Sequence, residues 1–306
     1  MTSPSTEQAF AAAGGAQAAL PDGTAAAHAW PADADVPITI IRPRKGWQAV
    51  DLRELWHYRE LLYFFVWRDV KVRYKQTVLG AAWAILQPVF SMIIFSVIFG
   101  NFAKIPSDGV PYPIFVYAGL LAWTFFANTV AQAGMSMVNE AQLLTKIYFP
   151  RLLVPSSSAG THLVDFALSF TIYVALMVWY SHVPGLTILL LPVLVVLTVI
   201  TALGTGYLLA GLAVTYRDFR YVIPFLLQAW MYASPVVYPV TLIPPQYQRL
   251  MALNPMAGII GAFRSALLNQ PVAWDLLGIS SFVAVGLFVL GLYNFRRTER
   301  WFADIA

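Results

Sequence analysis

Residues 166–216, FALSFTIYVALMVWYSHVPGLTILLLPVLVVLTVITALGTGYLLAGLAVTY, contain no Asp, Glu, Lys or Arg. A helix that crosses the core of a bilayer needs about 20 apolar residues, so this stretch can hold two such helices. The 306-residue chain is 59% hydrophobic and only 11% charged, which is more apolar surface than a soluble domain can bury. The sequence therefore predicts an all-α polytopic membrane protein, with further uncharged segments at 76–103, 109–139 and 221–248.

Hydropathy and charge together predict six transmembrane helices, near 79–100, 112–136, 153–180, 186–214, 220–239 and 275–295. Cytoplasmic loops of membrane proteins carry an excess of Lys and Arg. An even number of spans with both termini cytoplasmic places sixteen of the 19 basic residues inside and leaves only Lys104, Arg249 and Arg264 outside. The charges flank apolar spans, so they favour contact with membrane lipids and not with nucleic acid.

The N-terminal part of the chain divides into two pieces. Residues 1–36 are rich in Ala and Gly and carry acidic but no basic residues, which is typical of a disordered acidic tail. Residues 37–75 form a cytoplasmic segment, in which 51–75 mix apolar and basic residues at helical spacing. This pattern predicts an amphipathic interface helix on the membrane surface, followed by a six-span domain over 76–306.

A polar interruption, NEAQLLTKIYFPRLLVP, lies between two apolar spans at 139–155. The residue before a proline is disfavoured in the helical region, so Pro150 and Pro155 should end a short helix that begins near Asn139. Its apolar side chains suit a partner's groove, while Lys146 and Arg151 could pair with acidic groups at the rim. Alternatively, these two cations only bind lipid headgroups.

Residues 242–270 are hydrophobic but broken by Pro244, Pro245 and the pair Asn254-Pro255. The two pieces, near 245–253 and 255–268, are too short to cross a bilayer. We expect an external re-entrant helical hairpin between the fifth and sixth spans, and the alternative is an ordinary external loop.

Five strings occur in order along the chain: RYKQTVLGAAWAILQP (73–88), LLTKIYFPRLLVP (143–155), YRDFRYVIPFLLQ (216–228), SPVVYP (234–239) and LNPMAGIIGAFRSALL (253–268). Together they resemble the transmembrane permease subunit of bacterial ABC exporters for lipid-linked polysaccharides, the O-antigen or Wzm-like permeases, which are related to capsule and teichoic-acid exporters. The resemblance covers about residues 45–300.

The resemblance implies a homodimer in the bacterial inner membrane that binds two cytosolic nucleotide-binding subunits and exports an undecaprenyl-diphosphate-linked polysaccharide, O-antigen or a related glycan, to the periplasm. It assigns a coupling helix at 139–150 and external gate helices at 242–270, the latter with Asn254, Pro255 and Arg264. Contacts with the ATPase are expected from Asn139, Leu143, Leu144, Lys146, Tyr148, Phe149, Pro150 and Arg151.

The chain itself offers no chemistry for hydrolysing ATP. It lacks the G-x-x-x-x-G-K-[ST] phosphate loop, so ATP and Mg²⁺ are expected on the partner subunit, and no catalytic residue or cofactor is expected here. With no cysteine and four scattered histidines, a metal site is not expected either. The sequence thus predicts a transport subunit that needs an external energy source.

A path for a hydrated polymer should offer weak, repeated contacts to sugars, which aromatic faces can supply. The candidates for this lining are Trp83, Phe90, Phe95, Tyr117, Trp123, Phe225, Trp230, Tyr232 and Tyr238, although lipid contact and helix packing use aromatics equally. Arginine forks suit phosphate. Candidates for the pyrophosphate or headgroup are Arg73, Lys75, Arg217 and Arg220, with snorkelling and a local salt bridge to Asp218 as alternatives.

Asp165, with His162 three residues earlier, is an ionisable group inside a predicted span. Such a group is by default a functional hypothesis, and an ion-coupled flippase of lipid-linked glycans would depend on it. A structural hydrogen bond with His162 is the favoured interpretation. A membrane glycosyl or phosphoglycosyl transferase would need clustered acids, and the Asp-x-Asp at Asp33 and Asp35 lies in the predicted tail.

Overall fold

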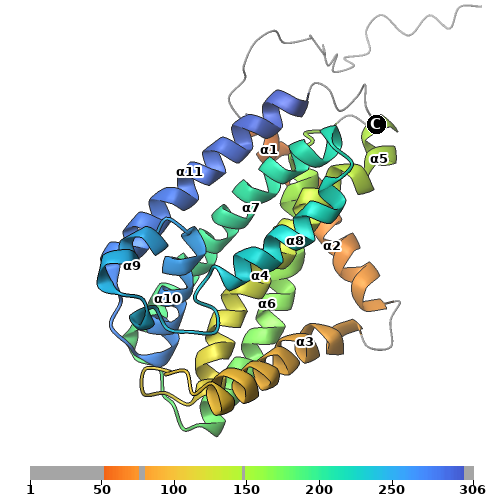
Figure 1. Ribbon diagram of the computed structural model, residues 1–306. Coiled ribbons are helices and arrows are strands. Elements are labelled where there is room, and N and C mark those ends of the chain that lie inside the picture. The colour runs from red at the N-terminus through yellow and green to blue at the C-terminus, as the bar shows by residue number, and fades with distance from the viewer. Residues whose placement is uncertain (1–51, 76–79, 147–148, 300–306) are drawn as a thin grey trace, which may run out of the picture. The chain divides into compact units, whose positions relative to one another are not determined.

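The computed structural model describes residues 52–75, 80–146 and 149–299, all within one compact unit, Trp47–Ala306 (Figure 1). Throughout these residues the regular structure is helical, as predicted. The predicted tail at 1–36 and the first part of the cytoplasmic segment lie outside the described residues.

Five of the described helices are long and apolar enough to cross a membrane. They are α3 (Gly80–Phe95) continued by a π-helical turn (Ser96–Phe102), α4 (Tyr112–Asn139), α6 (Leu153–Trp179), α7 (Leu191–Thr215) preceded by a 3₁₀ turn (Leu186–Leu190), and α11 (Trp274–Thr298). A pair of shorter helices, bent against each other, raises the number to six if the pair counts as one crossing.

The predicted span at 220–239 is only partly helical. Helix α8 (Phe219–Tyr232) has 14 residues, fewer than the roughly 20 that a full crossing needs. It ends because Pro235 has no N–H to continue the helix and Ser234 turns its hydroxyl back onto the carbonyl of Trp230, 2.8 Å away. The predicted continuous helix to residue 239 is therefore wrong, and the chain continues in turns to the 3₁₀ segment Val240–Leu242.

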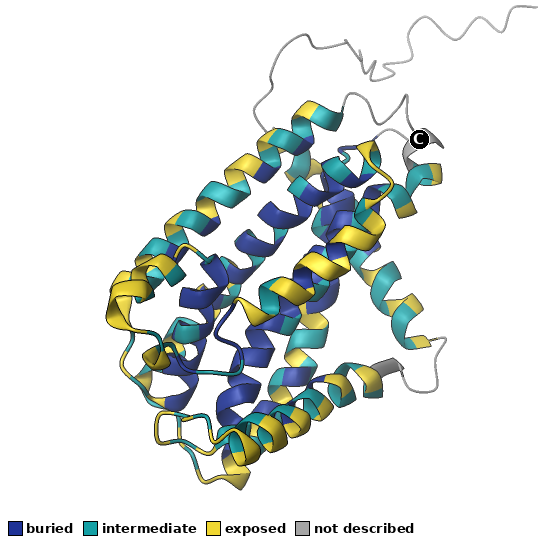
Figure 2. Ribbon diagram, in the orientation of Figure 1, coloured by how far each residue is buried: buried dark blue, intermediate teal, exposed yellow. Residues whose placement is uncertain are grey.

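Helix α4 forms the centre of the bundle. It packs against α6, α7 and α10, and every residue over 114–123 is buried (Figure 2). A helix that is apolar on all sides is expected in the interior, with other helices around it. The structural core therefore lies along this one predicted span.

Helices α7 and α11 run side by side in Figure 1 and meet at two glycines. A Cβ atom added to Gly291 would lie 1.9 Å from the carbonyl oxygen of Gly204, and one on Gly204 would lie 2.5 Å from the Cα of Phe288. Small residues let helix backbones approach closely in membranes, where burial of apolar surface does not drive helices together. These glycines thus set the spacing of the two helices.

The region at 242–270 contains helix α9 (Pro245–Met251) and helix α10 (Pro255–Leu268), bent by 109° at a short break. Asn254 makes the break: its side chain accepts a hydrogen bond from the N–H of Met256, and Pro255 occupies the first turn of α10. Asn269 ends α10 in the left-handed conformation, at φ 55°. The two predicted helices exist, and α10 is almost wholly buried.

The predicted helix at 51–75 is divided at Tyr58 into α1 (Leu52–His57) and α2 (Arg59–Lys75). Helix α2 packs against α6, where a Cβ on Gly160 would lie 2.6 Å from the side chain of Val66. Apolar side chains on the other surface of α2 remain exposed, including Tyr63, Phe64 and Trp67. One surface of α2 is thus fixed to the bundle and the other is uncovered.

We expect Gly204→Val to separate α7 from α11, because the added side chain would overlap the backbone of Phe288. Overpacking of this kind costs about 1–3 kcal/mol, which corresponds to a Tm lowered by roughly 3–10 °C. Thermal unfolding of the purified chain in detergent, followed by circular dichroism, measures it. The matched control is Gly286→Val on α11, where nothing lies within 4 Å; an equal loss in both variants would contradict the close contact.

Candidate functional site

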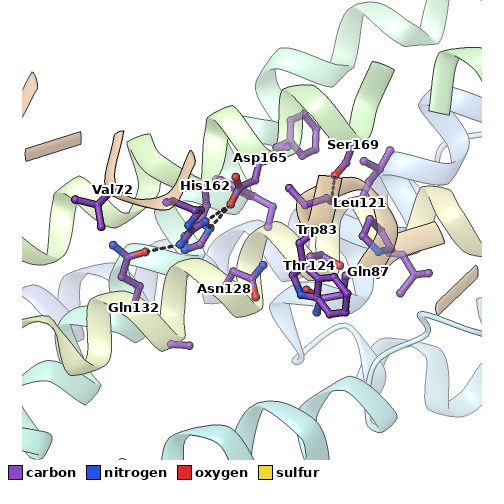
Figure 3. A pocket seen from close by; sticks show the side chains of 17 residues that line it. Val72, Trp83, Gln87, Leu121, Thr124, Asn128, Gln132, His162, Asp165 and Ser169 are labelled. Atoms are coloured by element: carbon purple, nitrogen blue, oxygen red, sulfur yellow. Dashed lines mark hydrogen bonds and ion pairs between the residues drawn. The ribbon is translucent and has the colours of Figure 1, made fainter. Parts of the chain in front are cut away.

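A cluster of ionisable groups joins helix α2 to helix α6. The carboxylate of Asp165 accepts short hydrogen bonds from Arg73 and Tyr74, and its Oδ2 lies 3.0 Å from Nδ1 of His162 (Figure 3). Burial, and then the hydrogen bond to Asp165, raise the pKa of Tyr74, so this phenol stays a neutral donor. The acid inside α6 is therefore paired with a cation and hydrogen-bonded.

This arrangement changes the expected role of two residues. Arg73 was a predicted ligand for pyrophosphate, but its guanidinium binds Asp165 and donates to the side chain of Gln132, 3.3 Å away. The predicted partner of Asp165, His162, is present, and Arg73 and Tyr74 join it. The local hydrogen bond predicted from sequence is thus one part of a larger group.

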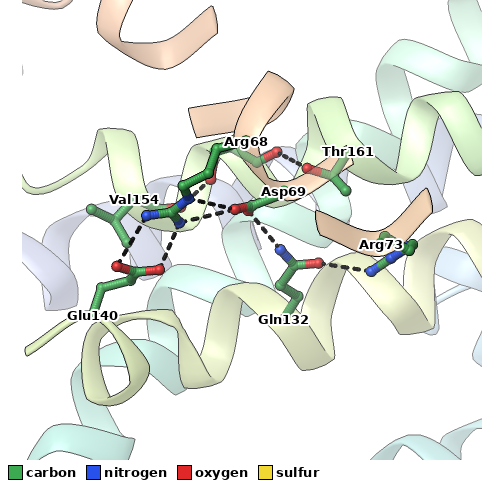
Figure 4. A network of polar contacts seen from close by, with 8 residues as sticks. Arg68, Asp69, Arg73, Gln132, Glu140, Val154 and Thr161 are labelled. Atoms are coloured by element: carbon green, nitrogen blue, oxygen red, sulfur yellow. Dashed lines mark hydrogen bonds and ion pairs between the residues drawn. The ribbon is translucent and has the colours of Figure 1, made fainter. Parts of the chain in front are cut away.

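The network continues towards the end of α4 (Figure 4). Gln132 donates to Asp69 at 3.1 Å, and the guanidinium of Arg68 binds Asp69 at 2.9 Å and Glu140 at 2.6 Å. Glu140 directly follows α4 and precedes the short helix α5 (Ala141–Lys146). Polar contacts therefore link the predicted interface helix both to the interior of the bundle and to the start of the predicted coupling helix.

Beside this network, α2, α3, α4 and α6 enclose a pocket of about 870 Å³. Three uncharged polar residues of α4, Thr124, Asn128 and Gln132, follow one another at intervals of four and so share one side of the helix. Trp83 and Gln87 of α3 line the same pocket (Figure 3). One wall of the pocket is thus a row of polar side chains on the central helix.

The predicted coupling residues differ in how far they are buried in the bundle. Phe149 is 5% exposed and packs edge to face against Phe65 of α2, with ring centroids 5.6 Å apart. Pro150 is also buried, and Arg151 donates to the carbonyl of Glu299 at the end of α11, 2.6 Å away. In this structure the ring of Phe149 fills an internal gap beside α2, and its predicted contact with a partner's groove stays a prediction.

Other residues of this segment remain candidates for contact with a partner. Asn139 is exposed and Leu143 half-buried. Tyr148 lies outside the described residues, as do the side chains of Leu144 and Lys146.

The predicted lining aromatics separate into exposed and packed groups. Tyr117 and Trp123 are buried in the core, and Tyr117 donates to the carbonyl of Ser169 at 3.2 Å, so in this structure both rings serve helix packing and their lining role stays a prediction. Trp230 packs edge to face on Phe126, donates to Asn254 at 2.8 Å and is only partly exposed. Phe95 and Tyr238 are also half-buried, whereas the most exposed candidates are Trp83, Phe90, Phe225 and Tyr232.

The remaining predicted headgroup residues, Lys75, Arg217 and Arg220, are exposed. Asp218 takes the N-cap position of α8 but makes no side-chain capping bond there. Asp218 thus occupies the predicted N-cap position without the capping hydrogen bond. Arg217 and Arg220 lie beside it at the start of α8.

Arg264 joins the predicted gate helix α10 to α4. Its buried guanidinium lies 3.8 Å from the ring centroid of Phe115 and donates to the carbonyls of Phe115, Val236 and Tyr238 at 3.3, 2.5 and 3.0 Å. Stacking and forked donors to carbonyl oxygens are contacts that an arginine provides and a lysine does not. The guanidinium of Arg264 also fills the space beside Gly119, because a Cβ atom added to this glycine would lie 2.8 Å from Nη2 of Arg264.

Sequence reasoning missed the pairing of Arg68 with Glu140 and the polar side of α4. The pair is separated by 72 positions, so no local spacing reveals it. The polar side of α4 could have been predicted, because Thr124, Asn128 and Gln132 follow one another at intervals of four in a segment without charges.

Comparison of the sequence with known proteins identifies its family. A model of the family described as ABC-2 type transporter matches residues 60–268, more than half of the chain. The chain belongs to the ABC-2 type transporter family. The matched region of this ABC-2 type permease runs from the start of α2 to the end of α10 and therefore contains the charge network, the pocket and the bent helix pair. The family predicted from the five strings is confirmed.

Several relatives of this ABC-2 type permease carry export names. The O-antigen export system permease protein RfbA of Myxococcus xanthus is 31% identical over 254 residues, which cover 81% of this chain and 96% of that protein. A protein of the same name from Klebsiella pneumoniae is 26% identical, over 80% of this chain and 95% of its own length. The polysialic acid transport protein KpsM of Escherichia coli is 25% identical, over 75% and 90%.

We expect the Arg73–Asp165 pair to show strong coupling in a double-mutant cycle. Asp165→Leu alone leaves the charge of Arg73 without its carboxylate, whereas adding Arg73→Met removes that charge as well. The double variant should therefore recover part of the Tm lost in Asp165→Leu, measured in detergent as above. Additive losses would show that the two side chains stabilise the fold independently.

Proposed function

We propose that this chain is the membrane-spanning permease of an ATP-driven exporter that moves a polysaccharide linked to undecaprenyl diphosphate, of the O-antigen class, from the cytoplasm to the periplasm. The observation that carries the proposal is the similarity to O-antigen export permeases over about four fifths of the chain. Five long apolar helices and a bent pair support a transport role, since they provide the bundle that such a path needs.

The orientation in this proposal places both termini in the cytoplasm of the bacterium. The excess of basic residues on that side favours it. Helix α2 then lies at the inner surface of the membrane, where the exposed side chains of Tyr63, Phe64 and Trp67 can enter the headgroup region. Lys71 and Lys75 follow Tyr63 and Trp67 at intervals of four on the same side of the helix, where they can bind anionic headgroups. Helices α9 and α10 form a re-entrant hairpin from the periplasmic side, which the 109° bend favours.

A homodimer is the assembly that best accounts for the exposed aromatic faces of α3 and α8. Phe225 is 74% exposed, and Phe90 and Tyr232 are also largely uncovered. Exposed positions recur along both helices in Figure 2. In one protomer these rings face outward, and a second copy would bring two such faces together. Flat apolar rings suit weak contacts with the C–H faces of sugars along a path between the copies.

The energy for export comes, in this proposal, from two nucleotide-binding subunits in the cytoplasm, which carry ATP and Mg²⁺. Helix α5 lies at the right place to receive their motion, because it follows α4 directly. Glu140 binds Arg68 of α2 at this point, so a displacement of α5 acts on both α4 and α2. The proposed coupling route therefore reaches α4 along the chain and α2 through this ion pair.

An ion-coupled flippase is the weaker alternative. It would require Asp165 to gain and lose a proton during transport. Both oxygens of the carboxylate have partners in the bundle, because Tyr74 donates to Oδ1 while Arg73 and His162 contact Oδ2. These contacts favour a structural role for the acid and leave ATP hydrolysis by a partner as the energy source.

We expect deletion of this chain from its native bacterium to remove the glycan from the cell surface while the lipid-linked glycan accumulates inside. Surface staining and extraction of lipid-linked glycans measure the two pools. Complementation with the wild-type chain should restore the surface glycan only when the partner ATPase is active, with an ATPase variant unable to hydrolyse ATP as the control. Normal surface glycan in the deletion strain would contradict the proposal.

We also expect Arg68→Glu to reduce export, because it places two carboxylates together at the start of the coupling helix. Combining it with Glu140→Arg restores opposite charges and should recover part of the export rate. Asp69 limits the recovery, since it also binds Arg68. Co-purification of the ATPase and surface glycan are the two readouts; a double variant no better than Arg68→Glu alone would argue against this route.

A further inference from the structure

The pocket between α2, α3, α4 and α6 contains amide and hydroxyl groups that the bundle does not use. Gln87, Thr124 and Asn128 face it, and within residues 52–75, 80–146 and 149–299 none of their side chains makes a hydrogen bond. Gln132 differs, because Asp69 and Arg73 bind it. Gln87 is exposed, whereas Thr124 and Asn128 are half-buried between apolar helices, where a polar group costs free energy unless it binds water or a ligand. The free groups therefore indicate a polar occupant.

The charges of the pocket restrict the chemistry of that occupant. Arg73 is a cation of the lining, and the carboxylate of Asp165 balances it directly. A diphosphate would have to displace this carboxylate from the guanidinium and would then lie beside it. A neutral ligand meets no such penalty. An acyl chain is disfavoured too, since it would cover the amides without hydrogen-bonding them.

The volume and the remaining walls of the pocket suit a sugar. The amides of Gln87 and Asn128 each carry donors and an acceptor, as sugar hydroxyls do, and Thr124 adds a further hydroxyl. Trp83, in the same lining and 56% exposed, offers a flat face for sugar C–H groups. A volume of about 870 Å³ lies within the range of small-ligand pockets.

We infer that this pocket is a subsite for a neutral, hydroxyl-rich sugar unit, held by Gln87, Thr124 and Asn128 and stacked on Trp83. The inference rests on the proposed export of a glycan, and it adds a place within the protomer where the first sugars are held. The subsite adjoins the network of Arg73 and Asp165, which joins α2 to the rest of the bundle. An occupant of the pocket would therefore contact α2, α3 and α4 at once.

The test uses the absence of cysteine from the whole sequence, which allows single cysteines to be placed without background. Thr124→Cys is examined in the full chain with its ATPase, in inside-out vesicles from two native strains, one with glycan synthesis intact and one blocked at the first sugar transfer. A small charged methanethiosulfonate reagent reports access. Ala118→Cys, on the buried part of α4 outside the pocket, is the matched control.

We expect the reagent to modify Thr124→Cys in vesicles without glycan and to do so several-fold more slowly in vesicles with glycan, while Ala118→Cys stays unmodified in both. Equal rates in the two vesicle types would show water alone in the pocket and overturn the inference. No modification in either would show a pocket closed by the protein or by a second copy, and would overturn it equally.

A second measurement separates this inference from the proposed function. Asn128→Leu should lower surface glycan several-fold, while ATPase binding and the Tm of the chain stay close to wild type. If the wild-type chain fails to support export, the proposed function fails. If the wild type exports and Asn128→Leu exports equally well, only the sugar subsite is wrong.

Discussion

The structure depends on one constraint: a polar group among apolar helices must find its partner inside the protein. The chain meets this constraint differently at the two ends of α4. Near Glu140, opposite charges from α2, α4 and α6 pair with one another and with Gln132. At the other end, Arg264 uses backbone carbonyl oxygens of α4 and of the segment after α8. These few polar contacts fix α2, α6 and α10 around the central helix α4.

Close packing of backbones completes what the polar contacts begin. Gly204 and Gly291 bring α7 and α11 together, and Gly160 lets Val66 of α2 lie against α6. In a bilayer, apolar area alone gives helices little reason to associate, so van der Waals contact and shape carry more of the stability. Gly160, Gly204 and Gly291 therefore lie at helix contacts. Gly278 and Gly286 of α11 differ, because nothing lies within 4 Å of a Cβ atom placed on them.

The sequence was sufficient for the features that are set by composition and by local breaks. Uncharged length located the long helices, and Asn254-Pro255 correctly divided α9 from α10. It was insufficient wherever the outcome depends on which side of a helix faces inward. Tyr117 and Phe225 are both aromatic residues within uncharged segments, yet the first is buried and the second exposed. The contact of Phe149 with Phe65 likewise joins distant parts of the chain, and no local pattern contains it.

The two ends of α4 differ in a further way, which follows from the kind of acceptor that each arginine uses. Carbonyl oxygens do not titrate in the physiological range, and the guanidinium of Arg264 is buried, so neither acid nor salt can loosen that joint easily. The ion pair of Arg68 with Glu140 is partly exposed to solvent and is therefore screened by salt. The central helix thus has one end anchored regardless of ionic conditions and one end whose attachment weakens as ionic strength rises.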